Sequence, residues 1–106
     1  MIKLYFSWEI PEALHSEFIG DWTRVTANNR SRFGLISATL RNNNTTFLSE
    51  AVWPDMEHHT KWLVEAGSDS ERLKWRAYKS NQEYSFDDFK TIVTIKDELH
   101  KDIPFA

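Results

Sequence analysis

The chain has 106 residues, of which 41% are hydrophobic and 27% charged, and it carries a formal net charge of −3 at pH 7 and no cysteine. This length favours one domain, residues 1–106, with a core of its own. The lack of cysteine excludes disulfides, thiolate metal sites and a cysteine nucleophile. The acidic balance argues against a nucleic-acid partner, because phosphate binding needs clustered lysine and arginine.

The first part of the chain predicts a strand followed by a helix. Apolar residues alternate with other residues from Ile2 to Glu9, which is typical of a strand with one face in a core. Pro11 ends this strand and suits the first turn of a helix. Apolar residues then recur at spacings of four, four and three from Leu14 to Val25. This stripe predicts an amphipathic helix from Glu12 to about Asn29.

A β-hairpin is predicted next. We expect one strand from about Leu35 to Leu40 and another from Thr45 to Trp53. The turn between them is assigned to residues 41–44, because asparagine tolerates a positive φ angle. Alternation in the second strand puts Trp53 on one face and Glu50 on the other.

The hydrophobic period changes from 2 to about 3.6 across Trp53-Pro54-Asp55. Asp55 therefore caps a helix that Gly67 ends. This places Trp53 at the end of a strand and beside a helix N-terminus, a junction that often lines a pocket in small α+β domains.

A further helix and a last strand are predicted toward the C-terminus. The spacing of Ser68 and Glu71 is that of a capping box, which starts a short helix running to about Lys79. The residues expected to face inward on this helix are Leu73 and Ala77, with Trp75 or Tyr78. A polar loop leads to a strand from about Phe89 to Lys96.

The order β-α-β-β-α-(α)-β predicts an α+β, ferredoxin-like split βαβ antiparallel sheet of four strands with helices on one face. Several strands carry apolar or aromatic residues on both faces, so the second face also needs cover. A second copy of the sheet is the simplest cover, and we therefore expect a homodimer. No segment resembles a signal core or a membrane span, so we expect a cytoplasmic protein with no membrane partner.

The segments GLISATL and TFLSEAVW, with a short turn between them and a polar-led helix after them, resemble the antibiotic biosynthesis monooxygenase superfamily. The resemblance covers about Ile2 to Lys96 and implies a ferredoxin-like dimeric α/β barrel. Oxygenases of this superfamily need no metal or flavin cofactor: a phenol or enol substrate is deprotonated, and its anion reacts with oxygen. The superfamily also includes haem-degrading enzymes and members without an assigned activity.

The resemblance implies roles for individual residues. Trp53 matches the tryptophan that commonly ends the third strand of the family. Members often carry a histidine near the position of Trp62, whereas His58 and His59 come earlier here, so that role carries over only with a shift in register. Haem degradation would also call for an asparagine on the first strand, which IKLYFSWE lacks. Haem binding or degradation is therefore a minor alternative.

Each candidate also has an ordinary structural interpretation. The Trp53 indole N–H can hold a substrate oxygen, or the ring can simply fill the core. His59 lies on the apolar stripe of its helix and can be a base or a hydrogen-bonded core histidine. His58 lies about 100° around the helix from His59, so the pair does not chelate one metal. Glu50 is either a buried base or a partner for Lys3 or Arg41.

We therefore expect a cofactor-independent monooxygenase that acts on a small aromatic or apolar substrate held between the sheet and the helices. Trp53 would orient the substrate and His59 or His58 would be the base. The other substrate-binding candidates are Tyr5, Trp22, Trp62 and Glu50. No metal or other cofactor is expected. The alternative is a non-enzymatic, dimeric ligand-binding or regulatory domain that uses the same pocket without turnover.

Overall fold

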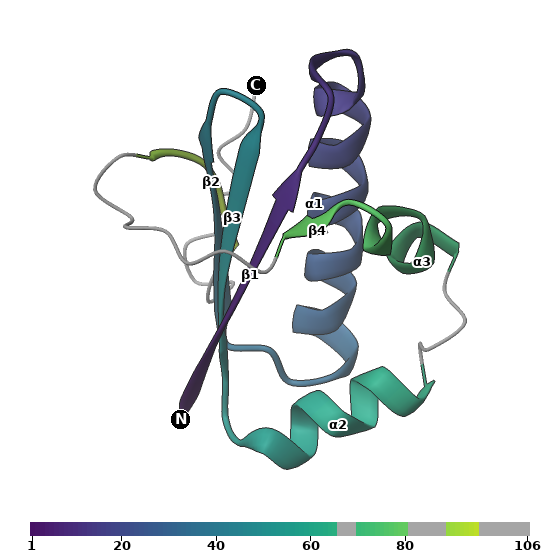
Figure 1. Ribbon diagram of the computed structural model, residues 1–106. Coiled ribbons are helices and arrows are strands. Elements are labelled where there is room, and N and C mark those ends of the chain that lie inside the picture. Colours follow the sequence, from purple (N-terminus) through teal and green to yellow (C-terminus); the bar gives the residue numbers. More distant parts are fainter. Residues whose placement is uncertain (66–69, 81–88, 96–106) are drawn as a thin grey trace.

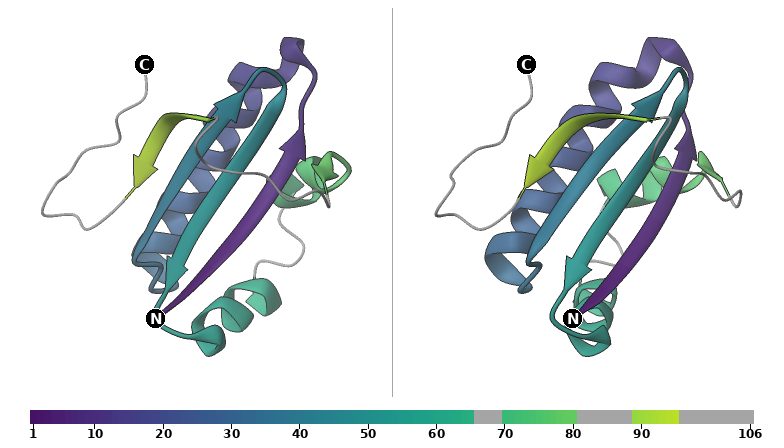
Figure 2. Two further views of the ribbon diagram at one scale, coloured as in Figure 1. Left: turned by 60° about the vertical axis from the view of Figure 1, so that its left-hand side comes forward. Right: turned by 90° about the vertical axis from the view of Figure 1, so that its left-hand side faces the viewer.

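The computed structural model describes residues 1–65, 70–80 and 89–95 and has an α+β architecture. Five strands form one antiparallel sheet in the order β4-β1-β3-β2-β5, and the helices pack on one side of it (Figure 1). This arrangement is consistent with a ferredoxin-like fold. Figure 2 shows the three long strands side by side, with the longest helix running along one face of the sheet.

The centre of the sheet follows the sequence prediction. β1 (Ile2–Glu9) pairs with β3 (Thr46–Trp53) along its whole length, and β3 forms a hairpin with β2 (Ser37–Asn43). The predicted turn at residues 41–44 is placed too early, because the strand continues to Asn43. The chain reverses over Asn44 and Thr45, and Asn44 has a φ of 55°, which asparagine adopts more readily than most residues.

The predicted first helix begins with a short 3-10 turn, η1 (Glu12–Leu14), and continues as α1 (His15–Arg32). Its apolar stripe is confirmed, since Phe18 and Trp22 are buried against the sheet. The helix extends past its expected end at Asn29, whose carbonyl oxygen accepts a hydrogen bond from the Phe33 backbone N–H at 3.0 Å. Asn29 is therefore a buried helical residue.

α2 (Met56–Glu65) begins directly after Asp55, as predicted. The Asp55 carboxylate accepts a hydrogen bond from the His58 backbone N–H at 2.9 Å, which is the geometry of an N-cap. The expected stop at Gly67 and the Ser68 end of the capping box lie outside the described residues.

The helix predicted to run to Lys79 ends earlier. α3 spans Ser70–Arg76, and β4 (Lys79–Ser80) pairs with the outer edge of β1. The backbone N–H of Glu9 donates to the carbonyl oxygen of Tyr78 at 2.9 Å. Pairing with an open sheet edge satisfies backbone groups that would otherwise lack partners, and local helix signals do not reveal this competition.

The expected inward face of this helix is also wrong for two residues. Leu73 is 42% exposed and Ala77 is exposed, whereas Trp75 is 5% exposed. The helix is short and lies beside α1 (Figure 1). A single large ring is therefore enough to dock it, and the smaller apolar residues stay outside.

The predicted last strand is present as β5 (Lys90–Ile95) and pairs with β2, with an irregularity in register between Leu40 and Arg41. The sheet thus has five strands, one more than expected. The additional strand is β4, which lies at the edge opposite β5.

The sheet has two different faces. We call the face that packs against the helices the helix-side face; it includes Phe6, Trp8, Phe47, Ser49 and Trp53. We call the other the open face; in the described part of the chain no helix packs on it, and it includes Tyr5, Thr39, Glu50 and Val52. Among the described helices, none is long and apolar enough to cross a membrane.

Candidate functional site

A cavity of about 450 Å³ lies between the helix-side face and the three α-helices. All five tryptophans of the chain line it, although they come from two strands and all three helices: Trp8, Trp22, Trp53, Trp62 and Trp75. A volume of this size accommodates a small organic molecule. The cavity is the strongest candidate for a functional site in the described part of the chain.

At the α2 end of the cavity, three rings meet. Trp53 and Trp62 stack with their centroids 5.9 Å apart and an angle of 23° between the ring planes. The His59 imidazole lies edge-on to Trp53, with centroids 5.4 Å apart, and is 7% exposed. His59 and Trp62 are three residues apart on α2, so both project from one side of the helix. The strand-to-helix junction thereby places an imidazole against two stacked indole rings.

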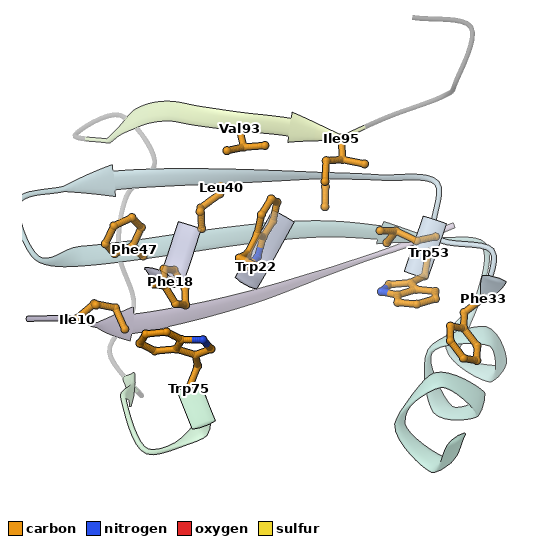
Figure 3. Close-up of a cluster of buried hydrophobic side chains, with 12 residues drawn as sticks. Ile10, Phe18, Trp22, Phe33, Leu40, Phe47, Trp53, Trp75, Val93 and Ile95 are labelled. Atoms are coloured by element: carbon orange, nitrogen blue, oxygen red, sulfur yellow. The ribbon is translucent and has the colours of Figure 1, made fainter. Parts of the chain in front are cut away.

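The opposite end is built around Phe18 of α1. Its ring centroid lies 5.1 Å from that of Trp8 and 5.1 Å from that of Trp75, which comes from α3. The Trp75 indole N–H donates to the Asp21 carboxylate at 2.9 Å and so fixes α3 onto α1. Figure 3 shows Trp22 between this group and Trp53.

Trp22 connects the helix to the sheet in the middle of the cavity. Its indole N–H donates to the hydroxyl oxygen of Ser49 at 3.3 Å. The indole N–H groups of Trp22 and Trp75 are therefore committed to partners within the protein. Their rings form fixed walls of the cavity.

The polar part of the lining is small. The polar residues are Asp21, Thr26, Asn29, Ser49 and His59, with Arg76 and Lys79 at the exposed rim. The Lys79 ammonium group lies 4.4 Å from the centroid of the Phe6 ring, within the range of a cation–π contact. An apolar cavity with few polar groups suits a flat aromatic ligand that carries few hydrogen-bonding substituents.

The structure brings four of the predicted site residues together and separates three from them. Trp22, Trp53, His59 and Trp62 all line the cavity. His58 is not among the lining residues: its Nδ1 lies 2.7 Å from the Asp55 carboxylate on the exposed side of α2. This contact and a backbone hydrogen bond lower the pKa of the Asp55 carboxyl group.

Tyr5 and Glu50 lie on the open face, away from the cavity, and are register partners on β1 and β3. Partial desolvation, the hydrogen bond with Glu50 and the Glu50 charge raise the pKa of the Tyr5 hydroxyl. Glu50 thus has a partner on its own sheet face. That partner is Tyr5, which the sequence analysis did not consider.

Sequence reasoning missed Asn29 as a site residue. It was assigned to the end of the helix, yet it is 5% exposed and lines the cavity. The available signal was its position seven residues after Trp22, which puts both on one face of a continuing helix.

The described residues were compared with the ligand sets that hold metal ions in proteins. Within residues 1–65, 70–80 and 89–95, no group of three or more histidine, aspartate or glutamate residues is arranged to hold a metal ion. The functional groups that the site offers are aromatic rings, one imidazole, amide and hydroxyl groups, a carboxylate and, at the rim, the cationic groups of Arg76 and Lys79.

Comparison of the chain with protein-family models, with curated proteins and with solved structures finds no match.

Proposed function

We propose that this protein binds a small aromatic molecule in the tryptophan-lined cavity and acts on it as a cofactor-independent monooxygenase related to the antibiotic biosynthesis monooxygenases. The observation that carries the proposal is the convergence of all five tryptophans and one buried histidine on a single cavity. A domain that needed these rings only for packing would have no reason to leave a space of about 450 Å³ among them.

The proposed reaction begins with a proton transfer. His59 accepts the proton of a phenol or enol hydroxyl, which leaves an electron-rich anion in an apolar surrounding. The anion reacts with O₂; one oxygen atom forms a new C–O bond, and the other leaves as water. For a phenol the overall change is phenol plus O₂ to quinone plus water, so the substrate itself supplies the electrons.

The contacts within the cavity favour His59 over His58 as the base. His59 contacts both Trp53 and Trp62 at the cavity wall, whereas His58 is held on the outside of α2 by Asp55. Trp53 has the role of orienting the substrate, with its ring stacked on Trp62. Neither Tyr5 nor Glu50 has a part in this site, since both lie on the open face.

Oxygen uptake tests the proposal. With a dihydroxynaphthalene or a hydroquinone as substrate, we expect protein-dependent consumption of O₂, and we expect His59→Ala to reduce the rate by about 10²- to 10⁴-fold, the usual effect of a general base. His58→Ala is the matched control, because it removes the neighbouring imidazole outside the cavity and leaves the rate close to that of the parent. Circular dichroism checks that both variants fold. A full rate in His59→Ala would show that the base is another group.

A non-enzymatic binding domain is the second candidate. The Trp22 and Trp75 indole N–H groups already have protein partners, and the lining has few other polar groups, which favours simple capture of an apolar ring. Saturable quenching of tryptophan fluorescence by a phenol, without oxygen uptake, would support this candidate. Because every tryptophan lines the cavity, the fluorescence reports directly on its occupancy.

We also propose that two copies associate through the open face to form the dimeric α/β barrel that the resemblance implies. Two observations support this assembly: α1, α2 and α3 all pack on the other face, and Tyr5 remains 50% exposed. A mass near twice 12.5 kDa in native mass spectrometry is the expected result. A bare monomer at micromolar concentration would refute the assembly.

A further inference from the structure

In the described part of the chain, the cavity wall includes a buried amide oxygen to which no residue donates a hydrogen bond. Asn29 lies near the C-terminal end of α1, is 5% exposed and lines the cavity. Its side-chain oxygen, Oδ1, is buried, and none of the described residues donates a hydrogen bond to it. Buried acceptors in folded proteins are nearly always paired with protein or water, so an exception at a cavity wall indicates a donor that enters from the cavity.

The backbone holds Asn29 in place. Its carbonyl oxygen accepts hydrogen bonds from the backbone N–H groups of Phe33 at 3.0 Å and Leu35 at 3.2 Å. These two bonds end the helix and turn the chain toward β2. The Asn29 side chain is therefore presented from a constrained backbone, and a rigid acceptor discriminates among ligands better than a mobile one.

Backbone contacts also show at which end of the cavity Asn29 lies. Leu35, which donates to the Asn29 carbonyl, is followed by Ile36, and the Ile36 backbone N–H donates to the Val52 carbonyl at 2.9 Å. Val52 directly precedes Trp53. Asn29 is thus connected to the end of β3 and shares the end of the cavity where Trp53 and His59 meet.

We infer that Asn29 is a specificity-determining residue whose Oδ1 accepts a hydrogen bond from a hydroxyl or amino group on the ring of the bound aromatic molecule. This inference rests on the proposed binding function and deepens it. A ligand without a donor at that position leaves the acceptor buried and unpaired, which lowers its affinity. The cavity therefore distinguishes a naphthol from its methyl ether, although both rings fit the same walls.

The acceptor also limits which hydroxyl group reacts. An amide oxygen stabilises a protonated hydroxyl and repels a phenolate, because both would present lone pairs to each other. The hydroxyl held by Asn29 therefore keeps its proton, and the hydroxyl that His59 deprotonates is a different one. The natural ligand class is an aromatic molecule with a second hydrogen-bond donor besides the reacting hydroxyl.

Calorimetric titration with 2-naphthol, 2-naphthylamine and 2-methoxynaphthalene tests this inference on the full chain. We expect the parent protein to bind the naphthol and the amine more tightly than the ether. Asn29→Leu, which keeps the side-chain size and removes the acceptor, should reduce that preference about tenfold, the effect of one buried hydrogen bond. Asn28→Leu is the matched control, since Asn28 is its exposed neighbour on α1, and it should leave the preference unchanged.

The outcomes separate the inference from the proposed function. Equal affinity of the parent protein for all three ligands would overturn the role of Asn29 while leaving the aromatic cavity in place. Binding of none of them would overturn both. If Asn29→Leu does not fold, Asn29→Ala, which also removes the acceptor, makes the same comparison with the parent protein.

Discussion

The two faces of the sheet are built from the same strands, yet they do different things. On the helix-side face, β1 and β3 contribute Trp8, Phe47 and Trp53 to a continuous cluster of rings. The same two strands place Tyr5 and Glu50 on the open face, where they contact each other and no described helix packs. Strand alternation separates the two sets completely, since neighbouring side chains point to opposite faces.

This difference assigns the two proposed activities to separate places. The helix-side face has the cavity, the imidazole and the unpaired amide oxygen, which are the elements of ligand binding. Around Tyr5 and Glu50, the open face has polar and half-exposed side chains, which suit a second copy of the chain better than an apolar ligand. A substitution on one face should therefore leave the property of the other face intact, and the following predictions test that separation.

The largest expected effect comes from removing a ring on the helix-side face. Phe18 is 1% exposed and its ring contacts those of Trp8, Phe47 and Trp75. We expect Phe18→Ala to lower the free energy of unfolding by about 3–5 kcal/mol, through lost burial and the space left behind. Urea denaturation followed by circular dichroism measures the change.

Tyr5→Ala on the open face is the control for Phe18→Ala. Because half of the Tyr5 side chain is already exposed, its loss should change the unfolding free energy of the monomer only slightly. Equal destabilisation by the two substitutions would mean that the open face is as tightly packed as the helix-side face, and the contrast between them would fail.

The second prediction concerns association. Thr39 is the register partner of Glu50 on the open face, so Thr39→Glu puts two carboxylates side by side in each copy of the chain. If the copies meet through this face, the dissociation constant of the dimer should rise at least about tenfold, because like charges in an interface are costly. Analytical ultracentrifugation over a concentration series measures it.

Val64→Glu provides the comparison for Thr39→Glu, since Val64 is an exposed apolar residue of α2. We expect this substitution to leave the dimer intact. Dissociation by Val64→Glu, with no effect of Thr39→Glu, would place the interface on the helices.

A smaller effect is expected for the titration of Tyr5. Desolvation, the hydrogen bond with Glu50 and its charge raise the pKa of this hydroxyl, so Glu50→Gln, which removes the charge, should lower it toward the ordinary tyrosine value. Spectrophotometric titration of tyrosinate formation shows the shift, and Tyr5→Phe identifies which part of the curve belongs to Tyr5. Ligand binding in the cavity should not change in Glu50→Gln.

The smallest effect is expected at the start of α2. The pKa of Asp55 is lowered by its hydrogen bonds from His58, so its carboxylate stabilises the folded state at neutral pH, and this contribution is lost as the pH falls through the lowered pKa. Asp55→Ala should therefore lower the melting temperature by a few degrees at pH 7 and by less in acid. An equal loss at both pH values would mean that the carboxylate charge does not contribute.

Local patterns of the chain were sufficient for the central elements. Alternation from Ile2 to Glu9, the apolar stripe through Phe18 and Trp22, and the Asp55 cap each depend on residues close together in sequence, and each is present in the structure. They also placed Trp53 at a strand-to-helix junction, where it lines the cavity together with His59. Neighbouring residues decide these features, because backbone hydrogen bonds and side-chain period act over only a few positions.

Tertiary contacts decided the rest. The pairing of Lys79 and Ser80 with β1, the burial of Trp75 and the position of Asn29 at a cavity wall all depend on residues that lie far apart in the chain. The sequence near Lys79 favours a helix, but pairing with the open edge of β1 is more favourable there. That edge is formed by residues far away in the chain, so the local pattern does not reveal it. The five tryptophans could be counted from the sequence, but only the packing of three helices on one sheet face brought them around one space.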